Sequence, residues 1–225
     1  MNSPHMQKTK RFKYAINRQL ITINKMETDK PSTQILKTLL KDFTIKPTVT
    51  SLAKKVGMSR VGTWKVLKKI QSEKLIILSS IGTGKTSAYN ILLNWGNPIV
   101  EKTLALALTK DALKNQRWCN NFAELEEKVD FLIIYGSILN SPNDANDIDI
   151  LGAVSNKKKF IEIEETVAKI QKTQHKKIHA LNFAQTELRQ ELERPNKAFI
   201  DAIKKGVILF GQENFIEFIR GVSKK

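Results

Sequence analysis

The sequence predicts an α+β protein, in which a basic and largely helical N-terminal part precedes a small mixed sheet covered by helices. Apolar residues recur at helical spacing over residues 31–73, and they form short runs or alternate over residues 131–154. The charge is also unevenly divided, because residues 1–100 carry 18 Lys and Arg against 4 Asp and Glu, whereas residues 101–225 carry 20 against 18. The basic half therefore favours a polyanionic partner, nucleic acid above all.

Composition excludes several other classes of protein. No apolar run approaches the roughly 20 residues that a membrane span needs, and the N-terminus lacks the apolar core of a signal peptide. Cys119 is the single cysteine, which excludes an internal disulfide and fits a reducing compartment. We therefore expect a cytoplasmic protein that makes no contact with a membrane.

The N-terminal half begins with a basic arm, residues 1–30, where lysines alternate with apolar residues. The sequence leaves open whether this arm is solvated or contacts phosphates or a dimer partner. A helix is predicted from Pro31, a second over Ser51–Val56 with Thr48 or Thr50 as its cap, and a third from Arg60 to about Glu73 with Ser59 as its cap. Gly57 supplies the turn between the second and third helices.

Two predicted strands, around Leu75–Leu78 and Ala88–Leu93, follow the third helix and flank a glycine-containing turn at 82–86. Two helices joined by a turn and followed by a β-hairpin resemble the winged-helix DNA-binding domain, over about Pro31–Trp95. We place this domain at residues 31–97. The Gly84-Lys85-Thr86 segment is not a P-loop, since position 79 is serine and a strand follows.

The resemblance implies that duplex DNA binds to one face of the third helix and to the tip of the wing. Thr63, Val66, Leu67 and Ile70 are spaced to face the core. Trp64 is ambiguous, because it can stack on DNA or complete the core. The residues expected to contact DNA are Ser59, Arg60, Trp64, Lys65, Lys68, Lys69 and Lys85.

Residues 98–225 are predicted to form a linker helix and a second domain. The helical pattern from Ile99 to about Lys128 breaks near Asn115 or Asn120, and its apolar side either packs in the core or forms a homodimer contact. The other predicted elements are helices at Phe160–Gln171, Thr186–Arg194, Pro195–Lys205 and Gly211–Arg220, and strands at Lys177–Phe183 and Val207–Phe210.

A motif with chemical meaning lies at Phe131–Val154. A buried strand, Phe131–Tyr135, ends in Gly136–Ser137, and a polar turn leads to a second strand that begins at Asp147. Period-two alternation puts Asp147 and Asp149 on one strand face, where they repel each other. A hard divalent cation would relieve this repulsion, and a Gly-Ser turn lets a phosphate approach closely.

This motif resembles the signature of the DNA polymerase β-like nucleotidyltransferases, in particular the minimal nucleotidyltransferase branch. The resemblance implies transfer of a nucleoside monophosphate from an NTP, most simply ATP, with release of pyrophosphate. Asp147 and Asp149 would be catalytic residues and ligands of Mg²⁺ or Mn²⁺, and Gly136 and Ser137 would hold the β- and γ-phosphates.

One part of the pattern is missing. Active members of that family usually carry a third carboxylate on the next strand, and Lys177–Phe183 has none. His179 or Asn182 would occupy the neighbourhood, Glu187 lies just beyond, and a bare strand face is the default expectation. Two functions stay open: an enzyme localised on DNA, or a transcription regulator whose degenerate domain senses nucleotide or serves as a scaffold. A third, weaker interpretation is an antitoxin that modifies a partner toxin.

Overall fold

Side-chain caps start the short helices of the N-terminal part. Three helices follow one another: α2 (Pro31–Lys41), α3 (Val49–Lys55) and α4 (Arg60–Ser72). The Thr48 side chain accepts a hydrogen bond from the Ser51 amide, and Ser59 does the same for Gly62. Gly57 takes φ +66° in the turn between α3 and α4, a conformation that favours glycine. An antiparallel hairpin of β1 (Ile76–Ile81) and β2 (Ala88–Leu93) follows.

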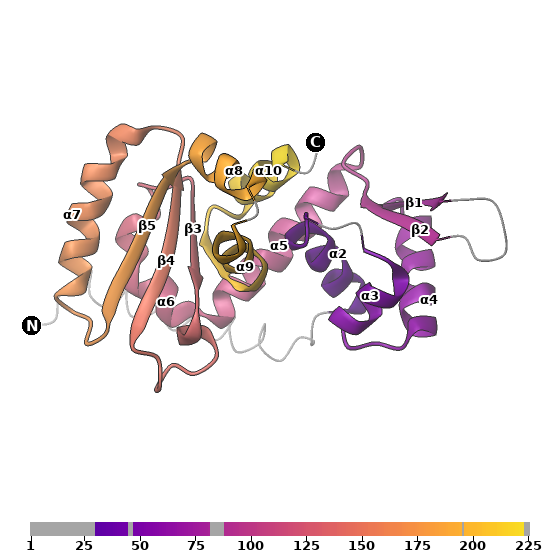
Figure 1. Cartoon of the computed structure of the whole chain (residues 1–225), viewed down its shortest axis with the longest axis horizontal. Helices are drawn as coiled ribbons and strands as arrows, with labels where there is room; N and C mark the ends of the chain where they lie inside the picture. The colour runs from indigo at the N-terminus through magenta and orange to yellow at the C-terminus, as the bar shows by residue number, and fades with distance from the viewer. Residues whose placement is uncertain (1–29, 45–46, 82–87, 195, 223–225) are drawn as a thin grey trace, which may run out of the picture. The chain divides into compact units, whose positions relative to one another are not determined.

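This computed structural model describes residues 30–44, 47–81, 88–194 and 196–222 (Figure 1). The predictions for the basic arm, the 82–86 turn and Lys85 therefore lie outside the described residues. Elsewhere the predicted elements are confirmed to within a few residues at their ends, and the α+β class is confirmed.

The larger sheet has the strand order β5-β4-β3-β6. β3 (Phe131–Tyr135) runs antiparallel to its neighbours β4 (Asp147–Val154) and β6 (Val207–Phe210), and β5 (Lys177–Ala184) runs parallel to β4. Because the parallel pair needs a crossover, α7 (Phe160–Gln171) links β4 to β5. The sheet therefore ends in β5 at one edge and β6 at the other.

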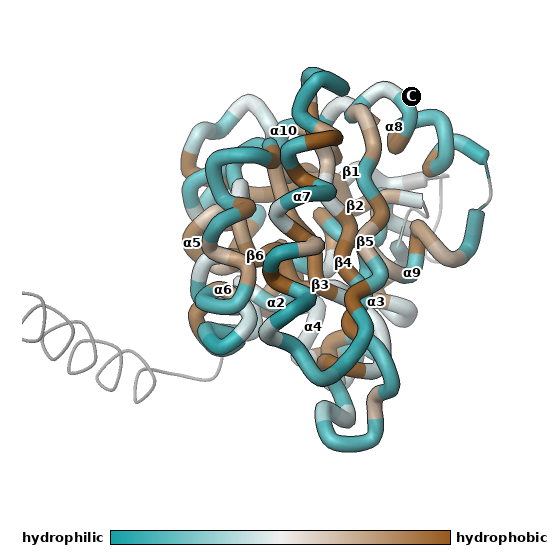
Figure 2. Tube along the Cα trace, turned by 90° about the vertical axis from the view of Figure 1, so that its left-hand side faces the viewer, coloured by the Kyte–Doolittle hydropathy of each residue, from teal (hydrophilic) through white to brown (hydrophobic). Residues whose placement is uncertain are grey.

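Helices cover both faces of this sheet (Figure 1). On one face α6 (Gln116–Asn121) and α7 pack against Ile134, Ile150 and their neighbours. On the other face α8 (Gln185–Glu193), α9 (Lys197–Lys205) and α10 (Gln212–Val222) pack against Phe131 and Ile133. Accordingly, the strands are mostly apolar and the outward turns of α7 are polar (Figure 2).

Helix α5 (Pro98–Lys114) joins the two parts of the described chain. Val100, Leu104 and Leu108 of α5 are fully buried in the same apolar core as Ile35 of α2 and Phe131 of β3. The helix ends at Lys114 with Asn115 as its C-cap, near the predicted break, and most of its apolar residues pack in the core while Ile99 and Leu106 are exposed. Residues 31–225 consequently form one compact unit. None of the described helices combines the length and apolarity that crossing a bilayer requires.

Polar contacts also tie α2 to α5 and α9. Lys37 pairs with Asp111 at 2.8 Å, and Lys204 pairs with the buried Asp42 at 2.7 Å. Lys41 donates a hydrogen bond of 2.6 Å to the Gly206 carbonyl. Burial lowers the pKa of Lys41 to about 8, with help from the positive charge of Lys37 and against the attraction of Asp111. The protein therefore holds a lysine charge where water solvates it poorly.

The partly buried Lys41 gives a test of this arrangement. Between pH 8 and 10.5 the folded protein binds fewer protons at Lys41 than the unfolded chain, so stability gained from this group rises with pH. We expect the unfolding free energy of the wild type, relative to Lys41→Met, to increase by about 3 kcal/mol from pH 7 to pH 10.5. Urea unfolding of both proteins at a series of pH values measures this difference in free energy. Lys158→Met, at an exposed position, is the control. A difference that stays constant with pH would contradict the burial of Lys41.

Candidate functional site

Hydrogen bonds at the start of β5 bring two strand ends together. The Gln171 side chain accepts a bond of 2.7 Å from the Ile178 amide and donates one of 3.1 Å to the Lys176 carbonyl. Lys176 in turn donates to the carbonyls of Asn143 and Ala145, in the turn that precedes β4. The first residues of β4 are thus held beside the first residues of β5.

This register assembles a cluster of three side chains from β4 and β5. Asp147 and Asp149 share one face of β4, and His179 is the partner of Asp149 in the parallel pairing. The His179 Nδ1 lies 3.2 Å from Asp147 Oδ2 and 3.6 Å from Asp149 Oδ1. The three side chains are 25–44% exposed, so the cluster is open to a ligand from solvent.

Gly136 lies directly against this cluster. Tyr135, the last residue of β3, pairs with Asp149, and the chain then turns at Gly136 with φ +84°. A Cβ atom added to Gly136 would collide with Asp149 Oδ2. Only glycine therefore fits here, for its backbone angle and for the space it leaves. Ser137 is exposed and begins a 3₁₀ turn, Ser137–Leu139, that Ile138 anchors in the core.

Burial and like charge shape the electrostatics of the cluster. Partial burial raises the pKa of Asp149, the charge of Asp147 raises it further, and His179 opposes both. The pKa of Tyr135 is also raised, first by burial and then by the negative charges of Asp149 and Asp147. The site thus concentrates negative charge and stabilises a cation beside it.

The donor set fits a metal ion. One ligand atom each from Asp147, Asp149 and His179 can lie within 4.8 Å of the others. Two carboxylates alone suit Mg²⁺, whereas an added imidazole shifts the preference toward transition metals such as Mn²⁺. The cluster could therefore hold a metal ion, and its residues do not by themselves identify Mg²⁺.

The next strand, β5, decides between the alternatives that the sequence left open. His179 contacts both carboxylates, as one alternative predicted, so the default expectation of a bare strand face is wrong. Asn182 projects to the other side of the strand, next to Gly152. Glu187 cannot contribute, because it pairs with Lys157 and accepts a hydrogen bond from Ala184 at the far end of β5. Because side chains alternate between the two faces of a strand, pairing β5 parallel to β4 places His179, and not Asn182, on the same face as Asp147 and Asp149.

The predicted DNA-contact residues of α4 share an exposed surface. Ser59, Arg60, Lys65, Lys68 and Lys69 are all exposed, whereas Thr63, Leu67 and Ile70 are buried as predicted. Trp64 is half-buried: its ring lies 4.9 Å from that of Tyr89 in β2, and Lys68 Nζ lies 5.0 Å from the Trp64 ring. Trp64 therefore packs against the hairpin while it borders the basic surface.

No protein-family model matches the chain, and a search among curated proteins finds no match. The geometry of the acidic cluster and of the exposed α4 residues is therefore the basis for assigning a function.

A pair of glycine variants tests the packing at Gly136. Gly136→Ala and Gly57→Ala both put alanine at positive φ, which costs about 1 kcal/mol of stability in each. Only Gly136→Ala also displaces a carboxylate, since the space beside Gly57 is open. We expect Mn²⁺ affinity, measured by calorimetry, to fall on the order of tenfold in Gly136→Ala and to stay unchanged in Gly57→Ala. Equal Mn²⁺ affinities in the two variants would contradict the contact between Gly136 and Asp149.

Proposed function

We propose that the chain is a winged-helix DNA-binding protein with a nucleotidyltransferase domain of the minimal, polymerase β-like kind. The domain binds an NTP, such as ATP, with a divalent cation and transfers a nucleoside monophosphate to an acceptor. One observation carries this proposal: Gly136, in the Gly136–Ser137 turn, lies against Asp149, one member of the carboxylate pair on the adjacent strand. In the proposed reaction this contact puts a phosphate-binding turn beside a metal-binding pair.

Each residue of the site has a role in this reaction. Asp147, Asp149 and His179 would hold the metal ion, which would supply positive charge to neutralise and orient the phosphates. Gly136 and Ser137 hold the β- and γ-phosphates through backbone amides and the serine hydroxyl. The acceptor oxygen bonds to the α-phosphorus as the bond to the β-phosphate's bridging oxygen breaks. Pyrophosphate leaves, and the acceptor hydroxyl gives its proton to water.

The second candidate function is nucleotide sensing without transfer. The observation that favours it is His179, which stands where a third carboxylate would serve the reaction. An imidazole can bind a metal ion but brings no negative charge to help hold a second one. In this alternative the nucleotide binds at the same turn, and the protein acts as a transcription regulator or scaffold.

Transfer activity distinguishes the two candidates. We expect transfer of label from α-³²P-ATP, with Mn²⁺, to an RNA or protein acceptor, and a fall of at least about a hundredfold in Asp147→Asn and Asp149→Asn, which remove ligand charge. Asp144→Asn, an exposed acid in the preceding turn, is the matched control and should retain full activity. ATP binding without transfer would support the sensor instead, and transfer that survives both substitutions would exclude the proposed site.

The same assay examines His179. Replacing it by aspartate restores a third carboxylate, so His179→Asp should work with Mg²⁺ about as well as with Mn²⁺, whereas the wild type should prefer Mn²⁺. An unchanged metal preference would remove His179 from the ligand set.

DNA binding by α4 is a separate prediction. Each phosphate contact that is lost reduces the number of counterions released when the protein binds DNA. Arg60→Ala, Lys65→Ala and Lys68→Ala together should therefore reduce the slope of log affinity against log salt by about 3. Fluorescence anisotropy with a labelled duplex measures the slope. The matched control removes three exposed lysines elsewhere, Lys102, Lys158 and Lys172, and should leave it nearly unchanged. Equal slopes in the two triple variants would show that α4 is not the DNA-binding surface.

A further inference from the structure

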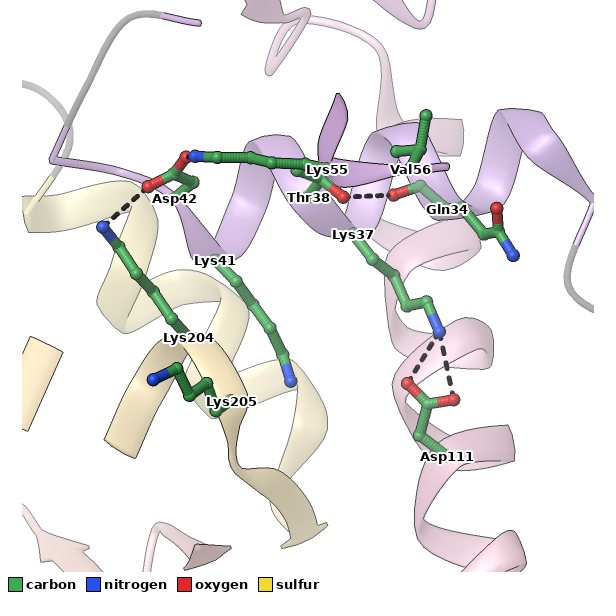
Figure 3. Close-up of a pocket in the computed structure, with 10 residues that line it drawn as sticks. All are labelled: Gln34, Lys37, Thr38, Lys41, Asp42, Lys55, Val56, Asp111, Lys204 and Lys205. Atoms are coloured by element: carbon green, nitrogen blue, oxygen red, sulfur yellow. Dashed lines mark hydrogen bonds and ion pairs between the residues drawn. The ribbon is translucent and has the colours of Figure 1, made fainter. Parts of the chain in front are cut away.

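A cavity lined mainly by lysines lies between α2, α3, α5 and α9 (Figure 3). Its volume is about 650 Å³, far more than one water molecule needs. Lys37 and Lys41 line it from α2, Lys204 and Lys205 from α9, and Lys55 from the end of α3 (Figure 3). Positive side chains from separate parts of the sequence therefore line one cavity.

Two aspartates, Asp42 and Asp111, offset only part of this charge. Asp111 pairs with Lys37, and the nearly buried Asp42 pairs with both Lys55 and Lys204. The other two lysines, Lys41 and Lys205, do not pair with either of these aspartates in the described contacts. Lys41 donates to the Gly206 carbonyl, and Lys205 pairs with Asp201 within α9. The lining residues thus carry more positive than negative charge, with five lysines against two aspartates.

The excess charge is costly where it is buried. Lys41 is partly buried, and this burial lowers its pKa to about 8. A bound anion would remove this cost, because it supplies the negative charge that the lining lacks. Lysine ammonium groups are compact point charges that bind phosphate well. Since the lysines are spread over α2, α3 and α9, an extended anion with several charges fits better than one phosphate.

The cavity lies at the end of the sheet that carries the acidic cluster. Gly206, which accepts the Lys41 hydrogen bond, precedes β6 and lies against Ile134 of β3. Ile134 stands two residues before Gly136. The lysine cavity and the acidic cluster are nevertheless built from different residues, and the cavity's lining contains no member of the cluster.

We propose that this cavity is a second anion site, which binds a linear di- or triphosphate group without a metal ion. The group comes either from a nucleotide or from free inorganic polyphosphate. Bound there, it would link α2 of the N-terminal part to α9 of the sheet domain, and so connect the DNA-binding part of the protein to the nucleotide state.

The test uses the full chain in EDTA, with inorganic tripolyphosphate as the probe and calorimetry as the readout. We expect the dissociation constant to be the same in the wild type and in Asp147→Asn with Asp149→Asn, and to rise at least tenfold in Lys41→Met and in Lys205→Gln. Lys205 is largely exposed, so Lys205→Gln keeps the test valid if Lys41→Met folds poorly. Lys158→Gln at an exposed position is the matched control and should bind like the wild type.

A parallel titration with ATP in EDTA identifies the source of the phosphate group. Tighter binding of ATP than of tripolyphosphate points to a nucleotide, and equal or weaker binding points to the inorganic chain. The proposal is overturned if tripolyphosphate does not bind, if both lysine variants bind it like the wild type, or if the two aspartate substitutions abolish binding. The last result would assign the phosphate to the acidic cluster, and it would leave the transfer reaction proposed above unaffected.

Discussion

The mutual repulsion of Asp147 and Asp149 is the constraint around which this end of the sheet is organised. The two carboxylates share a strand face, on which Asp149 is paired with Tyr135 of β3 and Asp147 with Lys177 of β5. Ile148 and Ile150 alternate with them and are almost completely buried on the opposite face. A shift of one residue in register would bury both charges and expose both isoleucines, so the apolar core holds the acids in place. The protein accepts a local electrostatic cost here that a bound cation would relieve.

The surroundings of Asp147 and Asp149 favour binding of an external cation, because the protein's own side chains do not neutralise the two carboxylates fully. His179 approaches both carboxylates, but it is uncharged unless protonated, and Gly136 leaves room where any side chain would displace Asp149. By contrast, the lining of the lysine cavity carries an excess of positive charge. The acidic cluster suits a cation, and the lysine cavity suits the negative charge of phosphate groups. This complementarity connects the two proposals while leaving each independently testable.

Local patterns predicted most of the architecture, because their physical causes are local. Thr48 and Ser59 cap helices through neighbouring amides, and the alternation after Asp147 reflects burial of one strand face. Contacts that depend on long-range pairing were predicted only in part. His179 and Asn182 were both candidates beside the acids, and the parallel pairing of β5 with β4 selects His179. Lys41 meets Gly206 across 165 positions of the chain, and no local pattern predicts that contact. Glu187 follows β5 closely in the sequence, yet the direction of β5 carries it to the end of the strand far from the two acids.

The most direct measurement is anomalous diffraction from crystals grown with Mn²⁺ and a non-hydrolysable ATP analogue. The account predicts a manganese peak within coordination distance of Asp147, Asp149 and His179, with the analogue's terminal phosphates on the Gly136–Ser137 turn. Manganese bound elsewhere, or a triphosphate that does not touch this turn, would contradict the assignment of the acidic pair as a nucleotide-metal site.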